Sequence, residues 1–94
     1  MRSILQDNTA ECLICGDARW LEWHHVFGAA NRTIAGQDGL VVRLCHRHHN
    51  EPPHGAHHNQ VFNRKLQAFA QKRAMEHYGW TLEEFMARYH RNYM

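Results

Sequence analysis

Two short pairs of metal-binding side chains constrain this chain more than any other feature of its sequence. Cys12 and Cys15 are separated by two residues, and Cys45 and His48 repeat that spacing later in the chain. A tetrahedral zinc ion is commonly held by four nitrogen and sulfur ligands from two such knuckles. Structural zinc contributes about 10–16 kcal/mol of apparent binding free energy, whereas a whole small domain is stable by about 5–15 kcal/mol. The pattern therefore predicts a structural zinc site that organises the fold.

More than one histidine can be the fourth ligand of this site. His46 or His49 can take the place of His48, although the two-residue spacing favours His48. Three unliganded cysteines in an apolar core are the competing interpretation. An odd number of cysteines cannot form a closed set of disulfides, and this spacing is typical of a metal site in a reducing compartment.

The size of the chain fits one domain. Its 94 residues bury only a modest core, for which a structural metal is a natural supplement. The formal charge of +2 is too small to indicate nucleic-acid binding by itself, but six of the side chains after Asn59 are Lys or Arg and three are Glu. No apolar run approaches ~18 residues, and the N-terminus lacks a signal-peptide pattern. We expect a soluble intracellular protein that does not bind membranes.

Apolar patterning predicts an α+β fold. Residues 20–27 are rich in aromatic and β-branched side chains and predict a strand or the first arm of a hairpin. Residues 40–44 predict a second short strand that leads into Cys45, and residues 46–50 predict a helical turn. The small and polar residues 28–39 between the strands predict a loop of functional length.

The C-terminal third predicts two helices. Residues 60–78 have helical periodicity, and Gly79 is well placed to end that helix. Thr81, with Glu84 three residues later, forms a capping-box sequence that begins the second helix. We expect their apolar side chains to fold back into the core, and a dimer face is the alternative. The side chains concerned are Phe62, Leu66, Phe69, Phe85, Tyr89 and Tyr93.

A second group of histidines lies partly between the two metal-binding pairs and partly just after the second pair. His24 and His25 are adjacent in the first predicted strand, and His49 follows His48 directly. Adjacent strand residues point to opposite faces, so His24 and His25 should have different neighbours. Ten histidines make chance proximity common in this chain. Even so, a purely structural zinc site has no use for this group, and its placement predicts a metal-dependent active site.

The sequence resembles the HNH family of ββα-metal (His-Me finger) nucleases, in the small zinc-knuckle form that phages encode. The residues that carry the resemblance are Trp-His-His-Val at 23–26 and Leu-Cys-His-Arg-His-His-Asn at 44–50, with His48 where the family usually has Cys. Gly-Ala-His-His-Asn at 55–59 matches a further family pattern, and the resemblance covers residues 12–59.

The resemblance implies both architecture and location. It implies one nuclease domain over residues 1–94, with a ββα-metal core at 11–59 stapled by zinc and a helical extension of two helices at 60–94. It also implies the cytoplasm of a bacterium or of a phage-infected host cell.

The resemblance implies a role for each histidine of the second group. His25 matches the general base that activates water, and His24 matches the metal ligand just before it. His49 matches the metal ligand on the α element. A further ligand is His57, with His54 as the alternative, because the family often places its last histidine four residues after His49, where this chain has a proline.

One family residue has no counterpart. The family's middle Asn should fall near Leu40, where no Asn is present. Asn31, Asn50 or Asn59 can serve instead, or a backbone carbonyl can hold His25.

The chemistry of the histidines predicts the activity. Phosphodiester hydrolysis needs a nucleophilic water and a cation against the scissile phosphate, and a neutral imidazole is a suitable base near pH 7. Imidazoles hold Mg²⁺ poorly and suit Zn²⁺, Ni²⁺, Co²⁺ or Mn²⁺ better. The sequence predicts a metal-dependent DNA endonuclease, one that nicks DNA with low sequence specificity because its contacts are mostly to phosphate.

Arg32 and Arg43 are the candidate phosphate contacts. The competing prediction is a non-catalytic, zinc-stapled module that binds nucleic acid or protein, which the missing Asn favours. The sequence leaves open whether the chain is a monomer or a homodimer.

Overall fold

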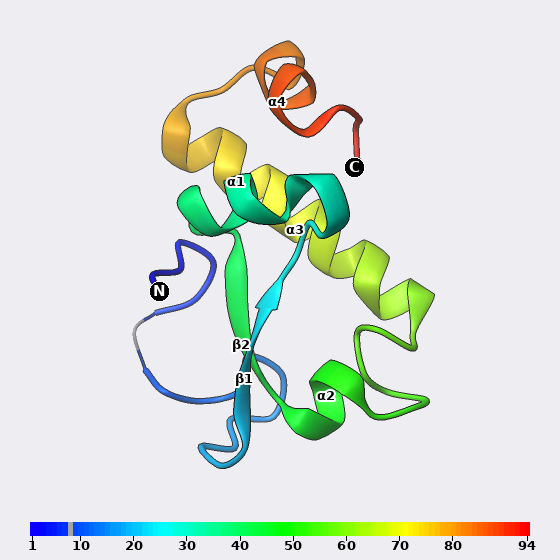
Figure 1. Ribbon diagram of the computed structural model, residues 1–94. Helices are drawn as coiled ribbons and strands as arrows, with labels where there is room; N and C mark the ends of the chain where they lie inside the picture. The colour runs from blue at the N-terminus through cyan, green and yellow to red at the C-terminus, as the bar shows by residue number, and fades with distance from the viewer. Residues whose placement is uncertain (8) are drawn as a thin grey trace.

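The computed structural model describes residues 1–7 and 9–94, which form a small α+β domain. The described residues contain one two-stranded antiparallel sheet, four α-helices and one 3-10 turn. The sheet lies at the centre of the domain, with α2 at its lower end and the other helices around its upper end (Figure 1). In chain order the elements are β1 (Leu21–His25), η1 (Ala29–Asn31), α1 (Arg32–Gln37), β2 (Val41–Cys45), α2 (His46–Asn50), α3 (Gln60–Tyr78) and α4 (Leu82–Tyr89).

The two strands confirm the predicted hairpin arms. They pair from Leu21 opposite Cys45 to His25 opposite Val41. Strand β2 carries Val41, Val42 and Leu44, which are fully buried, and such side chains suit a packed pleated surface. Because α2 starts at the residue after Cys45, the end of β2 and the first turn of α2 lie beside the start of β1.

The connection between the strands differs from the prediction. Residues 29–37 form η1 and α1 instead of a loop. Ala35 and Leu40 are fully buried, and the Leu40 N–H donates to the Ala35 carbonyl at 2.8 Å. A six-residue helix is too short to be stable by its own propensity. Packing against the core therefore stabilises a helix that composition did not reveal.

Gly79 and Thr81 act as predicted at the ends of the two C-terminal helices, and Asn59 provides a further cap. The Asn59 side chain accepts from the Phe62 N–H at 3.0 Å and begins α3. Gly79 ends α3 in the left-handed region at φ 68°, which a residue without a Cβ adopts at no steric cost. The Thr81 and Glu84 side chains form the reciprocal capping box at the start of α4.

The buried face of α3 carries smaller side chains than predicted. Leu66, Ala70 and Ala74 are buried, whereas Phe69 is 39% exposed. The predicted stripe through Phe69 is therefore wrong in part, because small alanine side chains let the helix approach the core closely. No described helix, α3 included, combines the length and apolarity that crossing a bilayer requires.

The C-terminal helix folds back into the core, as expected. Phe85 and Tyr89 are fully buried, and the Tyr89 ring lies 4.9 Å from that of Phe27. The buried Asp38 carboxylate accepts from the Arg88 Nε and from the Tyr89 hydroxyl, each at 2.6 Å. Phe85 and Tyr89 of α4 therefore pack within the chain's own core.

Two candidate metal centres

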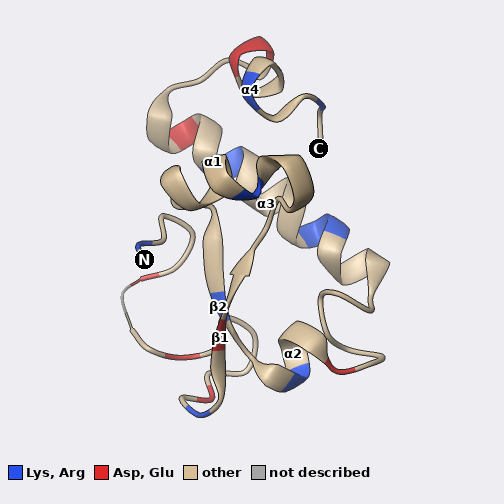
Figure 2. Ribbon diagram, in the orientation of Figure 1, with Lys and Arg blue, Asp and Glu red and all other residues tan. Residues whose placement is uncertain are grey.

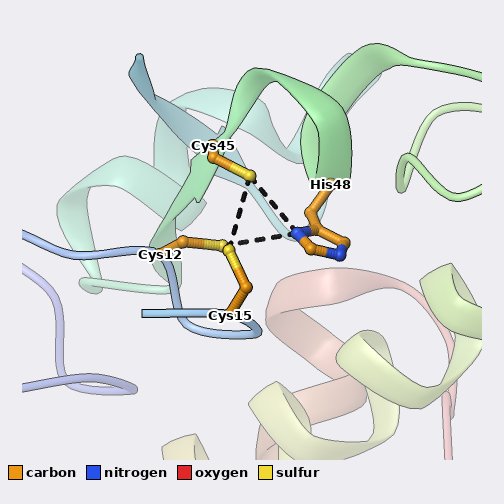
Figure 3. A group of neighbouring side chains, drawn as sticks. All are labelled: Cys12, Cys15, Cys45 and His48. Atoms are coloured by element: carbon orange, nitrogen blue, oxygen red, sulfur yellow. Dashed lines mark hydrogen bonds between the residues drawn. The ribbon is translucent and has the colours of Figure 1, made fainter. Parts of the chain in front are cut away.

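The first cluster consists of Cys12, Cys15, Cys45 and His48, whose side chains converge on one point (Figure 3). The Cys15 Sγ lies 3.7 Å from the Cys45 Sγ, and the His48 Nδ1 lies 3.3 Å from the Cys45 Sγ and 3.8 Å from the Cys12 Sγ. Ligands held tetrahedrally at zinc–sulfur and zinc–nitrogen distances lie roughly 3.3–3.8 Å apart. The cluster can therefore hold a metal ion such as zinc.

Local backbone contacts bring the four side chains together. The Gly16 N–H closes the first knuckle onto the Cys12 carbonyl at 2.9 Å, and the Leu13 N–H ties the knuckle to the Arg43 carbonyl of β2 at 2.9 Å. Cys45 is the last residue of β2. The first turn of α2 then returns the fourth ligand to the same place.

The groups of this cluster differ in protonation, because burial raises the pKa of the Cys45 thiol whereas the pKa values of Cys12 and His48 are lowered. Cys12 is 2% exposed, and although burial raises its pKa, backbone N–H donors, that of Cys45 foremost, outweigh this effect and lower the pKa of the thiol. Burial, followed by the positive charge of Arg47, lowers the pKa of His48. Thiolate sulfur and neutral imidazole are the forms that bind zinc.

The second cluster consists of His24, His49 and His57, whose ligand atoms all lie within 4.8 Å of one another. The Nε2 atoms of His49 and His57 are 3.0 Å apart, and the His24 ring lies 5.1 Å from each of the other two rings. Nitrogen ligands of one transition-metal ion lie roughly 3.0–3.4 Å apart. Of the two alternatives in the loop after α2, His57 joins the cluster and His54 does not.

Gly55 explains why His57 lies beside His49. A Cβ on Gly55 would lie 2.8 Å from the backbone nitrogens of Asn50 and Glu51, a distance that no side chain tolerates. The loop therefore lies directly on the end of α2, where the Gly55 N–H donates to the Glu51 carbonyl at 2.7 Å and the His57 N–H to the His49 carbonyl at 3.2 Å.

His24 is the most buried member of the second cluster. It is 4% exposed, and neither of its ring nitrogens has a hydrogen-bond partner among the described residues. Burial, followed by the neighbouring His49 and His57, lowers the pKa of His24 to about 3. Burying a polar group without a partner costs free energy. A metal ion bound by the ring would remove that cost.

Glu22 contacts the second cluster, a position that the sequence analysis did not single out. One carboxylate oxygen accepts from the His49 Nδ1 at 2.7 Å, and the other accepts from the His46 Nδ1 at 3.0 Å. The hydrogen bond from His49 lowers the pKa of Glu22. With its Nδ1–H donated to a carboxylate, His49 presents the lone pair of Nε2 to the cluster. The signal was present, because Glu22 lies two residues before His24 and shares its face of the strand.

His25 lies in the same cleft as the second cluster. The cleft has a volume of about 230 Å³, and its walls include His24, His25 and His57. Burial, followed by the positive charge of Arg32, lowers the pKa of His25, so its imidazole is neutral at pH 7. The two adjacent histidines thus have different neighbours, as predicted, and still meet at one cleft because His25 is the last residue of β1.

The candidate replacements for the family's Asn do not reach His25. The Asn31 amide donates to the Tyr89 carbonyl at 3.1 Å, the Asn59 carbonyl oxygen caps α3, and Asn50 is exposed. The His25 Nδ1 is buried and has no hydrogen-bond partner in the described part of the chain.

The two predicted phosphate contacts differ in their surroundings. Arg32 is exposed at the start of α1, close enough to His25 to affect its pKa. The Arg43 guanidinium instead lies 4.5 Å above the Trp23 ring and donates to the Thr9 carbonyl at 3.0 Å. Contacts within the fold already engage Arg43, whereas Arg32 is exposed near His25.

Comparisons with known proteins assign no family to the chain: no family model, no curated protein and no solved structure matches it. The function must be argued from the chemistry of the site.

Proposed function

We propose that this chain is a metal-dependent DNA endonuclease of the HNH (ββα-metal) type. The observation that carries the proposal is the three-histidine cluster of His24, His49 and His57, which borders the same cleft as the neutral His25. The succession of β1, β2 and α2 supports a ββα-metal unit. The Cys12–Cys15–Cys45–His48 cluster supports a zinc staple at the base of that unit.

Each histidine has a separate role in the proposed reaction. His25 accepts the proton of the attacking water, because its lowered pKa keeps the imidazole neutral at pH 7. His24, His49 and His57 hold a divalent ion, and Glu22 fixes the ring of His49. The bound ion supplies positive charge against the scissile phosphate and the leaving oxygen.

The ligand set favours a transition metal. All three ligands of the second cluster are imidazole nitrogens. Mg²⁺ prefers oxygen ligands, whereas Ni²⁺, Co²⁺, Mn²⁺ and Zn²⁺ accept imidazole readily. The first cluster contains three thiolates, which suit structural Zn²⁺.

The burial of His24 favours an enzyme over a pure binding module. A zinc-stapled module needs only the first cluster. A buried imidazole without a hydrogen-bond partner destabilises a protein that binds no second ion. The second cluster is therefore explained by a bound metal and not by stability.

The charged surface is compatible with DNA as the substrate. Arg32 is exposed beside His25, and Arg64 and Lys65 are exposed on the first two turns of α3, where the ribbon of Figure 2 is blue for Lys and Arg. Contacts from such side chains to phosphates carry no sequence information, so we infer cutting of low sequence specificity.

Nicking of supercoiled plasmid tests the proposal. Purified protein is incubated with plasmid and with Ni²⁺, Co²⁺, Mn²⁺ or Mg²⁺ at equal low concentrations, and EDTA stops the reaction. We expect nicked circles with the first three ions and a slower reaction with Mg²⁺. The absence of nicking with every ion, from protein shown to contain both metals, would refute the proposal.

A further inference from the structure

The cleft has a second wall that the histidines do not provide. Asn63 and Gln67 of α3 line it opposite the β1 residues His24 and His25. They are four residues apart and therefore share one face of the helix. The C-terminal extension is thus part of the cleft.

The side-chain amides of Asn63 and Gln67 do not hold the fold together through hydrogen bonds to described residues. Both side chains are half-buried, and neither makes a side-chain hydrogen bond to a described residue. Gln71, one turn further along α3, is different, because its amide binds the Asn92 side chain at 2.9 Å and the Tyr93 N–H at 2.6 Å. The two cleft amides keep their donors available for a ligand.

The charge around this wall identifies the ligand as an anionic chain. None of the side chains that line the cleft is acidic. Arg64 and Lys65 neighbour the wall on α3, and neither forms an ion pair within the described residues. Arg32 is exposed and close enough to His25 to act on it electrostatically. A strand that crosses the cleft therefore meets neutral donors at this wall and cations next to it.

We propose that Asn63 and Gln67 bind the sugar-phosphate backbone of DNA next to the bond that is cut. This inference rests on the proposed nuclease function and adds a substrate-binding wall to it. The amides donate to phosphate and sugar oxygens, and Arg64 and Lys65 attract the neighbouring phosphates.

Two measurements on matched variants test this role. The Asn63→Ala/Gln67→Ala double variant is compared with Gln60→Ala, which removes an exposed amide at the start of the same helix that does not line the cleft. Affinity for a short fluorescein-labelled duplex is measured by anisotropy in a His25→Ala background. Plasmid nicking gives KM and kcat without that background.

We expect the double variant to bind the duplex roughly ten-fold more weakly, as the loss of two hydrogen bonds predicts, with KM raised and kcat little changed. Gln60→Ala, the melting temperature and the affinity for Ni²⁺ should not change. An isosteric variant, Gln67→Glu, keeps the volume and places a negative charge opposite phosphate. It should weaken binding further.

The outcomes separate this inference from the proposed function. Unchanged duplex affinity and KM in the double variant and in Gln67→Glu would overturn the inference while leaving the nuclease assignment intact. An equal loss in Gln60→Ala would also overturn it. If the wild type binds duplex but never nicks, and the double variant loses affinity, Asn63 and Gln67 remain DNA contacts and the nuclease assignment falls. If the wild type does not bind DNA, both fall.

Discussion

Two neighbouring residues of α2, His48 and His49, belong to different clusters. His48 completes a set of three sulfurs and one nitrogen, in which Cys12 is 2% and Cys45 is 7% exposed. His49 belongs to a set of three nitrogens at the edge of a cleft. A closed set of four ligands suits a structural ion, whereas three ligands leave a coordination position open for water or substrate. In the proposed function, one short helix therefore connects a structural site to a reactive one.

The largest expected effect comes from the sulfur-rich cluster. Cys45→Ser should unfold the domain or make it aggregate, because it removes a ligand of an ion that contributes about 10–16 kcal/mol of apparent binding free energy. Zinc content and a thermal melt measure the effect. His54→Ala, an exposed histidine outside both clusters, is the control and should melt like the wild type. A cooperative melt with full zinc content in Cys45→Ser would remove the structural role of this cluster.

The next effect separates chemistry from metal binding within the second cluster. His25→Ala should keep both ions and lose about 10²–10⁴-fold in nicking rate, the usual contribution of a general base. His24→Ala should instead lose the second ion, because it removes a ligand. Nicking rates at saturating Ni²⁺ and metal content distinguish the two variants, with exposed His77→Ala as the control. Wild-type nicking by His25→Ala would show that another group is the base.

A smaller effect is expected from the carboxylate behind the second cluster. Glu22→Gln removes the charge that holds the His49 Nδ1–H and should weaken Ni²⁺ binding about 10–100-fold, as is typical of such partners. Titration calorimetry measures the affinity, with exposed Glu83→Gln as the control. Zinc in the first cluster should be unaffected. Equal Ni²⁺ affinity in the two variants would mean that the Glu22 contact has no part in metal binding.

The smallest effect is a graded dependence on pH. Burial lowers the pKa values of His24 and His57, so their neutral, ligating forms persist as pH falls below the ordinary histidine value of about 6.5. We expect constant Ni²⁺ affinity through that value and a progressive loss only at more acidic pH, as protons compete for the ring nitrogens. The thiolate cluster should keep its zinc over this range. If zinc were lost at a higher pH than nickel, the assignment of the two sites would be wrong.

The sequence predicted the elements whose signals are local. The strands, the Gly79 end of α3 and the Thr81 cap all depend on residues a few positions apart. The grouping of Cys12, Cys15, Cys45 and His48 was also predictable, because ligand spacing limits how four side chains can surround one point.

Features that depend on tertiary packing were beyond the sequence pattern. Helix α1 is stabilised by the burial of Ala35 and has no periodic signal of its own. The choice of His57 over His54 depends on Gly55, whose lack of a side chain lets the loop lie on the end of α2. The approach of Asn63 to the cleft depends on the path of α3, which no local pattern specifies.

Counting the metal ions on the intact chain tests the central claim most directly. Native mass spectrometry of protein loaded with Zn²⁺ and then Ni²⁺ should find two ions per chain, of which brief chelation removes one. The His24→Ala/His57→Ala variant should carry a single zinc and keep a cooperative melt. One ion on the wild type, or two on the variant, would contradict the account of one structural and one reactive centre.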